Sequence, residues 1–178
     1  VVASSALYRS ESAVPAHART AVRAPVPATV PGTVHTDLLA ASLIPDPYLD
    51  RNERDVDWIG RVPWVYERDL EHEVVAGERV LLAFEGLDTV ATVRVNDVEV
   101  ATTRNMHRRY EVPITDALRP GRNVLTVRFE SAWTYGEAER ERLGRLPSEY
   151  PGPFNYLRKM ACNFGWDWGP ALVTAGIW

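Results

Sequence analysis

The segment from Phe154 to Pro170, FNYLRKMACNFGWDWGP, gathers the residues of this chain that are best suited to chemistry. Asp167 stands between Trp166 and Trp168, and glycines and a proline flank the triplet. Glycine and proline in these places favour a backbone that turns sharply and then holds one shape. In a flat strand Asp167 would point away from both tryptophans, whereas in a bend the three side chains can converge.

Such a combination of side chains suits the recognition of a sugar. A pyranose has apolar C–H faces, and an indole offers a large flat apolar surface with one polar group. A carboxylate accepts strong, charge-assisted hydrogen bonds from two neighbouring hydroxyls. Arg158 and Lys159 could orient the carboxylate or contact the ligand. The alternative is that both tryptophans belong to the core and that Asp167 only forms a turn, and the residues alone leave both interpretations open.

Other catalytic or metal sites find little support in the sequence. A retaining glycosidase needs two carboxyl groups about 5–5.5 Å apart, and the spacing of the chain suggests no partner for Asp167. The four histidines form no metal-binding pattern, and Cys162 has no second cysteine, so we predict neither a metal nor a cofactor. Residues 45–63 carry several aspartates, but their spacing matches no EF-hand, which favours a solvated loop over a calcium site.

The composition is that of a folded domain. The chain has 178 residues, of which 46% are hydrophobic and 25% charged, and its net charge is −4. The absence of a basic excess argues against nucleic acid as a partner. No apolar run approaches the roughly 20 residues of a membrane span, and residues 1–12 do not resemble a secretory signal. These observations predict a cytoplasmic protein without a membrane partner.

The elements that must position the tryptophan segment are mostly strands. From Trp64 onward β-forming residues dominate, and short strands recur every 8–12 residues, which indicates an antiparallel sandwich or barrel. Asn96-Asp97 is the expected two-residue hairpin turn. After the strand that starts at Trp64, the predicted strands are Arg79–Phe84, which we expect to be buried, Thr89–Val95, Tyr110–Ile114 and Asn123–Phe129.

Two short helices are also predicted. Thr36–Leu43 should begin with Thr36 as its cap and bury Leu38, Leu39 and Leu43 on one face. Glu137–Leu143 alternates glutamate and arginine at three- and four-residue spacing, which is typical of a solvated helix face lined by ion pairs.

The chain resembles β-mannosidases of glycoside hydrolase family 2. Val30–Leu70 is similar to the opening of those enzymes, and Leu157–Trp178 carries the specific W-D-W-G-P run after R-K. The region between them includes the family's G-x-N-x-L-x-V pattern at Gly121–Val127. The resemblance implies an all-β, galactose-binding-domain-like jelly-roll β-sandwich over residues 26–178, with one or two short helices. Residues 1–25 would form a first strand and a linker.

The resemblance also implies a function. In this family the jelly roll precedes immunoglobulin-like domains and a (β/α)₈ barrel of about 250 residues that carries the two catalytic glutamates. We therefore expect the accessory domain of a retaining exo-β-mannosidase, which removes terminal β-D-mannose, with no catalytic residue in this chain and no activity of the fragment alone. Its partners would be a mannoside or manno-oligosaccharide together with the barrel.

The resemblance assigns roles to individual residues. Asp167 would accept hydrogen bonds from hydroxyls of the terminal mannose, Trp166 would wall the pocket, and Trp168 would pack beneath it with Arg158 and Lys159 as further support. One more strand after Trp178 would be needed to complete the sheet. Two alternatives are a free-standing carbohydrate-binding module and the same domain from a family 2 enzyme that acts on galactosides, glucuronides or glucosaminides.

Overall fold

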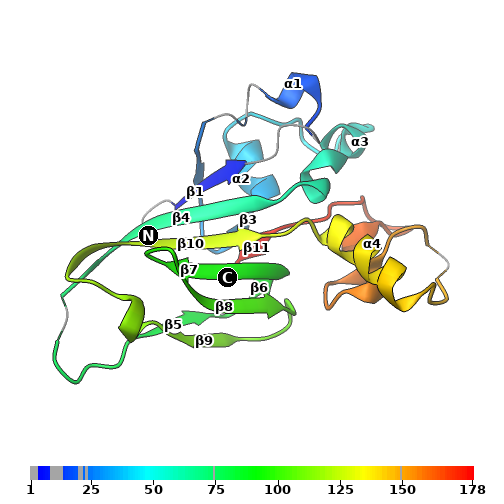
Figure 1. The fold of residues 1–178 in the computed structure, drawn as a ribbon. Coiled ribbons are helices and arrows are strands. Elements are labelled where there is room, and N and C mark those ends of the chain that lie inside the picture. Colours follow the sequence, from blue (N-terminus) through cyan, green and yellow to red (C-terminus); the bar gives the residue numbers. More distant parts are fainter. Residues whose placement is uncertain (1–3, 9–13, 20–21, 23, 74, 149) are drawn as a thin grey trace.

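A large antiparallel sheet forms one layer of the domain (Figure 1). The computed structural model describes residues 4–8, 14–19, 22, 24–73, 75–148 and 150–178. The sheet has six strands, which lie in the order β2 (Val26–Ala28), β1 (Ser4–Tyr8), β4 (Trp64–His72), β10 (Gly121–Phe129), β7 (Val90–Val95) and β8 (Val98–Arg104). β1, which lies within residues 1–25, pairs with both β2 and β4 and so belongs to this sheet.

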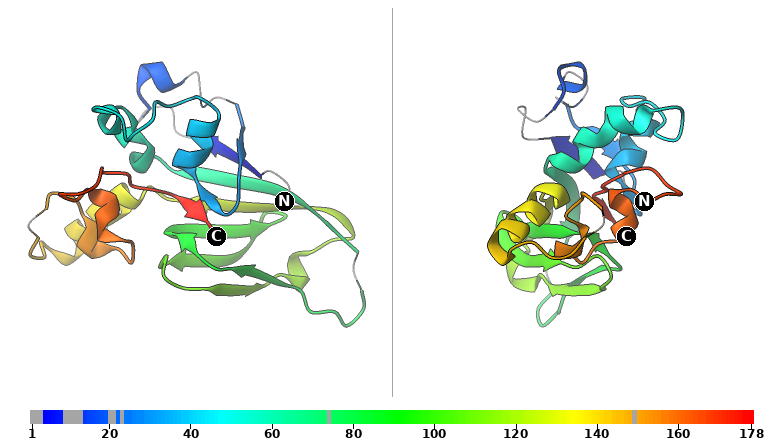
Figure 2. Two further views of the ribbon diagram at one scale, coloured as in Figure 1. Left: turned by 180° about the vertical axis from the view of Figure 1, so that it is seen from behind. Right: turned by 90° about the vertical axis from the view of Figure 1, so that its right-hand side faces the viewer.

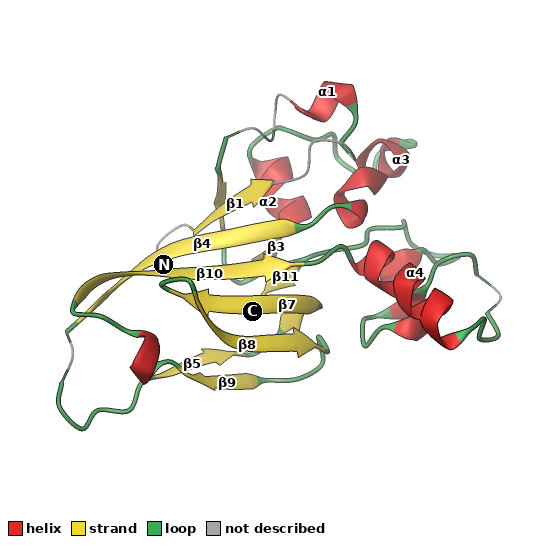
Figure 3. Ribbon diagram, viewed as in Figure 1, coloured by secondary structure: helices red, strands yellow, loops and turns green. Residues whose placement is uncertain are grey.

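Two smaller sheets form the second layer. One contains β3 (Gly32–Thr33), β11 (Gly176–Ile177) and β6 (Leu87–Asp88), and the other contains β5 (Leu81–Phe84) and β9 (Tyr110–Pro113). Figure 3 shows the strands in yellow. The two layers form the β-sandwich that the sequence predicted.

The core lies between the layers and follows the two-residue period of the strands. The register pairs Trp64 with Phe129 and Tyr66 with Val127 across β4 and β10, so these side chains share one face. The Phe129 ring meets the Tyr66 ring edge-on at 5.8 Å between centroids. Phe84 and Val112 of the small sheets belong to the same buried cluster. This shared cluster makes the two layers one core.

The hairpin turn between β7 and β8 is confirmed at Asn96-Asp97. Both residues have positive φ angles, 50° and 68°, as a type I′ turn requires. The side-chain amide of Asn96 donates to the carbonyl of Ala117 and to Oδ1 of Asn123. These bonds tie the turn to the segment that leads into β10.

The chain contains more helix than predicted. The α-helices are α1 (Ala16–Arg19), α2 (Val34–Ala40), α3 (Asn52–Val56) and α4 (Ala132–Leu143). In Figure 3, α1, α2 and α3 lie near the β1–β4 side of the large sheet, and α4 lies beyond the ends of β10 and β11. Short 3₁₀ turns are η2 (Asp57–Arg61), η3 (Thr115–Ala117), η4 (Phe154–Tyr156) and η5 (Ala161–Phe164). Among these helices, none is long and apolar enough to cross a membrane within the part of the chain that the structure describes.

Both predicted helices begin earlier than expected. α2 is capped by Thr33, and Thr36 occupies the third helical position of the same capping box, so the assignment of Thr36 as the cap was wrong. Leu38 is buried but Leu39 faces solvent. α4 starts at Ala132 because Ser131 accepts a hydrogen bond from the Thr134 amide at 3.0 Å. The expected ion pairs of Glu137–Arg140 and Glu139–Arg142 are present.

β5 is a strand as predicted, but it is not a buried one. Leu81 is 48% exposed and Ala83 also faces solvent, whereas Phe84 lies in the core. The apolar run alone predicted burial on both faces. In the described chain β5 pairs only with β9, so one of its edges and one of its faces remain open.

Candidate functional site

The tryptophan segment ends in a tight turn, as its glycines and proline predicted. The Trp166 amide donates to the Gly169 carbonyl at 3.2 Å, and the Gly169 amide donates back at 3.4 Å. Gly165 enters the turn with φ 100°, a conformation that side-chain-bearing residues rarely adopt. Asp167 and Trp168 occupy the tip, and both are exposed. The turn therefore presents a carboxylate and an indole together at the surface.

Four aromatic rings form a continuous row beside this turn. The Trp166 and Trp168 rings lie 6.4 Å apart between centroids. Tyr150 stacks on Trp166 at 5.2 Å with an interplanar angle of 25°, and Phe154 meets Tyr150 at 6.4 Å. We call Phe154, Tyr150, Trp166 and Trp168 the aromatic row. Tyr150 was missed in the sequence, because it lies in the loop after α4 with no periodic pattern around it.

The exposed fractions of the indoles assign their roles differently from the sequence prediction. Trp168 is 73% exposed and Trp166 is 39% exposed. The expectation that Trp168 packs beneath the turn was wrong, because Trp166 is the ring that rests on Tyr150. Trp168 is not a core residue of the described chain, since a core residue would be covered.

Lys159 lies in the interior and does not reach the carboxylate of Asp167. Its ammonium donates to both carboxylate oxygens of Asp88 at 2.6 Å and to the carbonyl and hydroxyl of Thr174 at 2.9 Å. The Thr174 hydroxyl in turn donates to Asp88 at 2.6 Å. The prediction that Lys159 supports a ligand or orients Asp167 is therefore wrong, because all its described bonds point into the core.

We call Asp88, Lys159 and Thr174 the buried clamp. The Lys159 side chain is 0% exposed and that of Asp88 is 1% exposed. Burial lowers the pKa of Lys159, and the facing Asp88 carboxylate opposes that shift. Lys159 and Thr174 stand at the two ends of the loop that carries the tryptophan turn. The clamp thus closes the base of this loop and fixes it to β6, which contains Asp88.

Two further hydrogen bonds fasten the loop and the residue before it. The Met106 amide donates to the Arg158 carbonyl at 3.0 Å, and Ala171 donates to Glu53 of α3 at 3.3 Å. The Arg158 side chain is exposed, in a hollow that it shares with Arg104 and Tyr135. Its expected contribution to a ligand stays a prediction.

His35 is buried next to the clamp. Burial and, to a smaller extent, the charge of Lys159 lower its pKa from 6.5 to about 4, while Asp88 acts in the opposite direction. Its Nδ1 atom is buried with no hydrogen-bond partner among the described residues. His35 is therefore held in its neutral form, which lets it share a small volume with an ammonium group.

The aspartates of residues 45–63 perform local structural tasks. Asp46 accepts a hydrogen bond from the Tyr48 amide at 2.9 Å, and Asp57 pairs with Arg61 at 2.6 Å. Within the described ranges, no three histidine, cysteine or acidic residues lie close enough together to hold a metal. These local contacts account for Asp46 and Asp57, but the prediction of a solvated loop over residues 45–63 is wrong in part, because residues 52–61 form α3 and η2 and bury Val56, Trp58 and Ile59.

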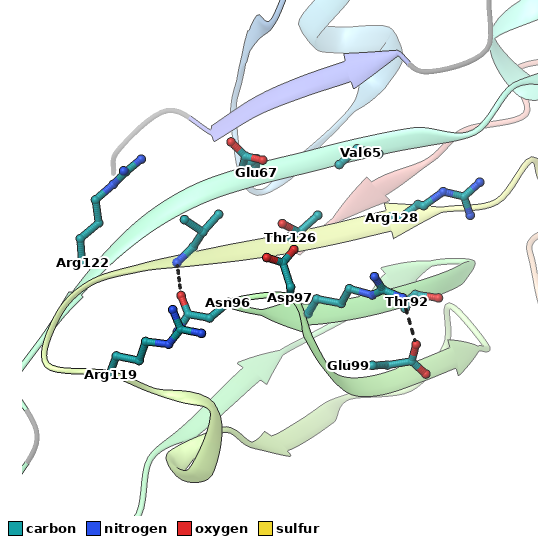
Figure 4. A pocket seen from close by; sticks show the side chains of 12 residues that line it. Val65, Glu67, Thr92, Asn96, Asp97, Glu99, Arg119, Arg122, Thr126 and Arg128 are labelled. Carbon is teal, nitrogen blue, oxygen red and sulfur yellow. Dashed lines mark hydrogen bonds and ion pairs between the residues drawn. The ribbon is translucent and has the colours of Figure 1, made fainter.

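A separate hollow of about 830 Å³ lies on the outer face of the large sheet (Figure 4). Besides Val65 and Val124, its walls carry charged and small polar side chains and no aromatic ring. Arg94 pairs with Glu99 across it, and Arg122 pairs with Asp69. Without an aromatic platform, this face lacks the stacking surface that the tryptophan turn offers to a sugar.

The chain belongs to a family of domains found in glycoside hydrolases. Residues 10–178 match the family described as the glycosyl hydrolase 2 galactose-binding domain-like family. The β-mannosidase of Bos taurus is 41% identical over an alignment of 164 residues, with 86% of this chain and 18% of that protein covered. β-Mannosidase B of Aspergillus niger is 38% identical over 162 residues, with 86% of this chain and 19% of the relative covered.

Solved structures agree with this relationship. The β-D-mannosidase of Dictyoglomus thermophilum superposes with a TM-score of 0.79 at 31% identity, over 99% of this chain and 21% of that one. The exo-chitosanase CsxA of Amycolatopsis orientalis has a TM-score of 0.59 at 22% identity, over 73% of this chain and 16% of that one, and shares the fold. The chain spans about a fifth of the length of these relatives.

Proposed function

We propose that this chain is the N-terminal accessory domain of a retaining exo-β-mannosidase, and that its tryptophan turn forms one wall of the terminal-sugar subsite. The proposal rests on one observation above all: Asp167 and Trp168 are both exposed to solvent at the tip of a loop whose base is fixed to the core. The identity to β-mannosidases supports the choice of sugar.

Each residue of the wall has its own task in this proposal. Trp168 offers a flat apolar face to the sugar ring, and Trp166, backed by Tyr150, forms the side of the subsite. Asp167 accepts hydrogen bonds from ring hydroxyls. The two carboxyl groups that retention requires come from another part of the full-length enzyme, so the 178-residue chain does not hydrolyse mannosides by itself.

The first test is Asp167→Asn in the full-length enzyme. The substitution keeps the shape of the side chain and removes its charge, so it weakens charge-assisted bonds to the sugar hydroxyls. We expect kcat/KM on a nitrophenyl β-mannoside to fall about 100-fold, equivalent to roughly 2.7 kcal/mol. Asp97→Asn is the matched control, because Asp97 is an exposed turn residue at a different hairpin, and it should leave turnover unchanged. Near-normal turnover by Asp167→Asn would refute the site.

The second test separates an enzyme domain from a free-standing binding module. Calorimetric titration of the 178-residue chain with mannose and manno-oligosaccharides is expected to show no measurable heat, because a single wall buries too little of a ligand. Saturable heat would favour the binding module instead. A panel of nitrophenyl glycosides on the full-length enzyme separates β-mannoside from β-galactoside, β-glucuronide and β-glucosaminide specificity.

A further inference from the structure

The segment that follows α4 encloses a hollow beside the aromatic row. The hollow has a volume of about 570 Å³, and its walls include Arg140 and Glu141 from the last turn of α4. Arg145, Tyr150 and Asn155 of the following segment form the opposite wall. Figure 2 shows α4 and this segment, in yellow and orange, at one end of the domain beyond the strands. We call this space the loop hollow.

Side chains of the segment hold the walls of the loop hollow in place. The Tyr156 hydroxyl donates to the Gly144 carbonyl at 2.8 Å and accepts from the Leu146 amide at 2.6 Å. The side-chain amide of Asn155 donates to the Pro147 carbonyl at 3.2 Å. These bonds fasten the segment onto itself directly after the helix ends. The loop hollow is therefore formed before any ligand arrives, as small-molecule sites usually are.

Tyr150 joins the loop hollow to the tryptophan turn. It lines the hollow, and its ring also stacks on Trp166 at 5.2 Å between centroids. Trp166 in turn lies 6.4 Å from Trp168 at the tip of the turn. A ligand that extends from Trp168 along the aromatic row therefore reaches the loop hollow next.

The polar groups of the loop hollow suit a neutral ligand that is rich in hydroxyls. Arg140 is paired with Glu137, whereas Arg145 and Glu141 are exposed and form no ion pair within the described part of the chain. A guanidinium donates hydrogen bonds and a carboxylate accepts them, while a sugar hydroxyl does both. One free charge of each sign favours a neutral sugar over an anion. Tyr150 is 41% exposed, so its ring adds an apolar surface for a pyranose.

The hollow on the outer face of the large sheet is larger but fits a saccharide less well. Arg94 and Arg122 already pair with acidic neighbours there, and no aromatic ring lines that space. The loop hollow combines unpaired polar groups with a ring and adjoins the tryptophan turn. These differences single out the loop hollow as the second place where this domain contacts a sugar chain.

We propose that the loop hollow is a subsite for the leaving-group sugars of a manno-oligosaccharide, which follow the terminal mannose along the chain. Arg145 and Glu141 bind their hydroxyls, and Tyr150 contacts an apolar ring face. The inference rests on the proposed function, because the terminal mannose must lie at the tryptophan turn. Binding energy from remote parts of a substrate lowers the barrier at the reacting bond, so the subsite favours oligosaccharides over mannosides with small leaving groups.

Arg145→Ala in the full-length enzyme tests the subsite through two kinds of substrate. A nitrophenyl β-mannoside has a single sugar, whereas manno-oligosaccharides, tested from the disaccharide to the hexasaccharide, extend toward the loop hollow. The measured quantity is kcat/KM for the best oligosaccharide divided by kcat/KM for the nitrophenyl mannoside. We expect Arg145→Ala to lower this ratio about 10-fold, the loss that corresponds to one hydrogen bond to a charged group.

Arg142→Ala is the matched control. Arg142 lies on the same helix end, pairs with Glu139 and does not line the loop hollow, so its removal should keep the ratio of the unaltered enzyme. An unchanged ratio in Arg145→Ala at every oligosaccharide length would overturn the inference. An equal fall in Arg142→Ala would also overturn it, because the effect would then arise from the charge of this surface in general.

The outcome is separable from that of the proposed function. The ratio is measured on an enzyme that cleaves both kinds of substrate, so an unchanged ratio counts against the loop hollow alone. Absence of mannoside turnover, or near-normal turnover by Asp167→Asn, counts against the proposed function instead.

Discussion

Replacing Lys159 with methionine is expected to lower the free energy of unfolding by about 3–5 kcal/mol, because it leaves the Asp88 carboxylate buried without its partner. Both side chains are almost fully buried, and the ammonium makes two bonds of 2.6 Å to the carboxylate. Methionine has a similar length, so the loss reflects the charge more than the packing. Denaturation by urea, followed by tryptophan fluorescence and circular dichroism, measures the change.

The matched control removes both charges. Lys159→Met combined with Asp88→Asn leaves no unpaired ion, so the double variant should be more stable than the sum of the single losses predicts. The coupling energy should exceed about 1 kcal/mol. Strictly additive losses would mean that the ion pair does not fasten the loop. A second readout is the quenching of tryptophan fluorescence, because a loop without its clamp should expose the half-covered Trp166 indole to quenchers more readily.

The strands and their hairpin were predictable because local patterns specify them. The dominance of β-forming residues identified the strand from Trp64. Asn96-Asp97 identified the turn, since only a few residue types adopt two successive positive φ angles. The exposure of β5 was not predictable in this way. An apolar run looks the same whether its neighbouring strand is present or not, and burial depends on that neighbour.

The candidate site was predictable in part. The run of Trp166, Asp167 and Trp168 between glycines indicated a sharp turn, and the structure has that turn. The roles of Lys159 and Tyr150 could not be inferred from the sequence. Lys159 is eight positions from Asp167 in the chain, yet it pairs with Asp88, 71 positions away. Tyr150 joins the aromatic row only because the loop after α4 folds back toward Trp166. Contacts of this kind depend on tertiary folding and leave no local pattern.

Stability is expected to fall as the pH drops from 6.5 toward 4, and His35 should account for a large part of the slope. The pKa of His35 is about 4 in the folded chain and 6.5 in its ordinary state, so between these values the unfolded chain binds more protons. Stability rises with pH wherever the unfolded state holds more protons. The contribution of His35 to the free energy of unfolding is therefore fully present above pH 6.5 and is lost as the pH falls toward 4. The full difference corresponds to roughly 3 kcal/mol.

His35→Gln isolates this contribution, because glutamine cannot titrate and keeps a polar side chain in the pocket. The free energy of unfolding is measured by urea denaturation at several pH values between 4 and 7 for both chains. The difference between the two curves should grow toward pH 7 and flatten above it. Asp37 acts in the opposite sense, since burial raises its pKa and acid then favours the folded state, but it is unchanged in both chains and cancels. Parallel curves would show that His35 takes up its proton equally in both states, and that its burial beside the clamp does not keep it neutral.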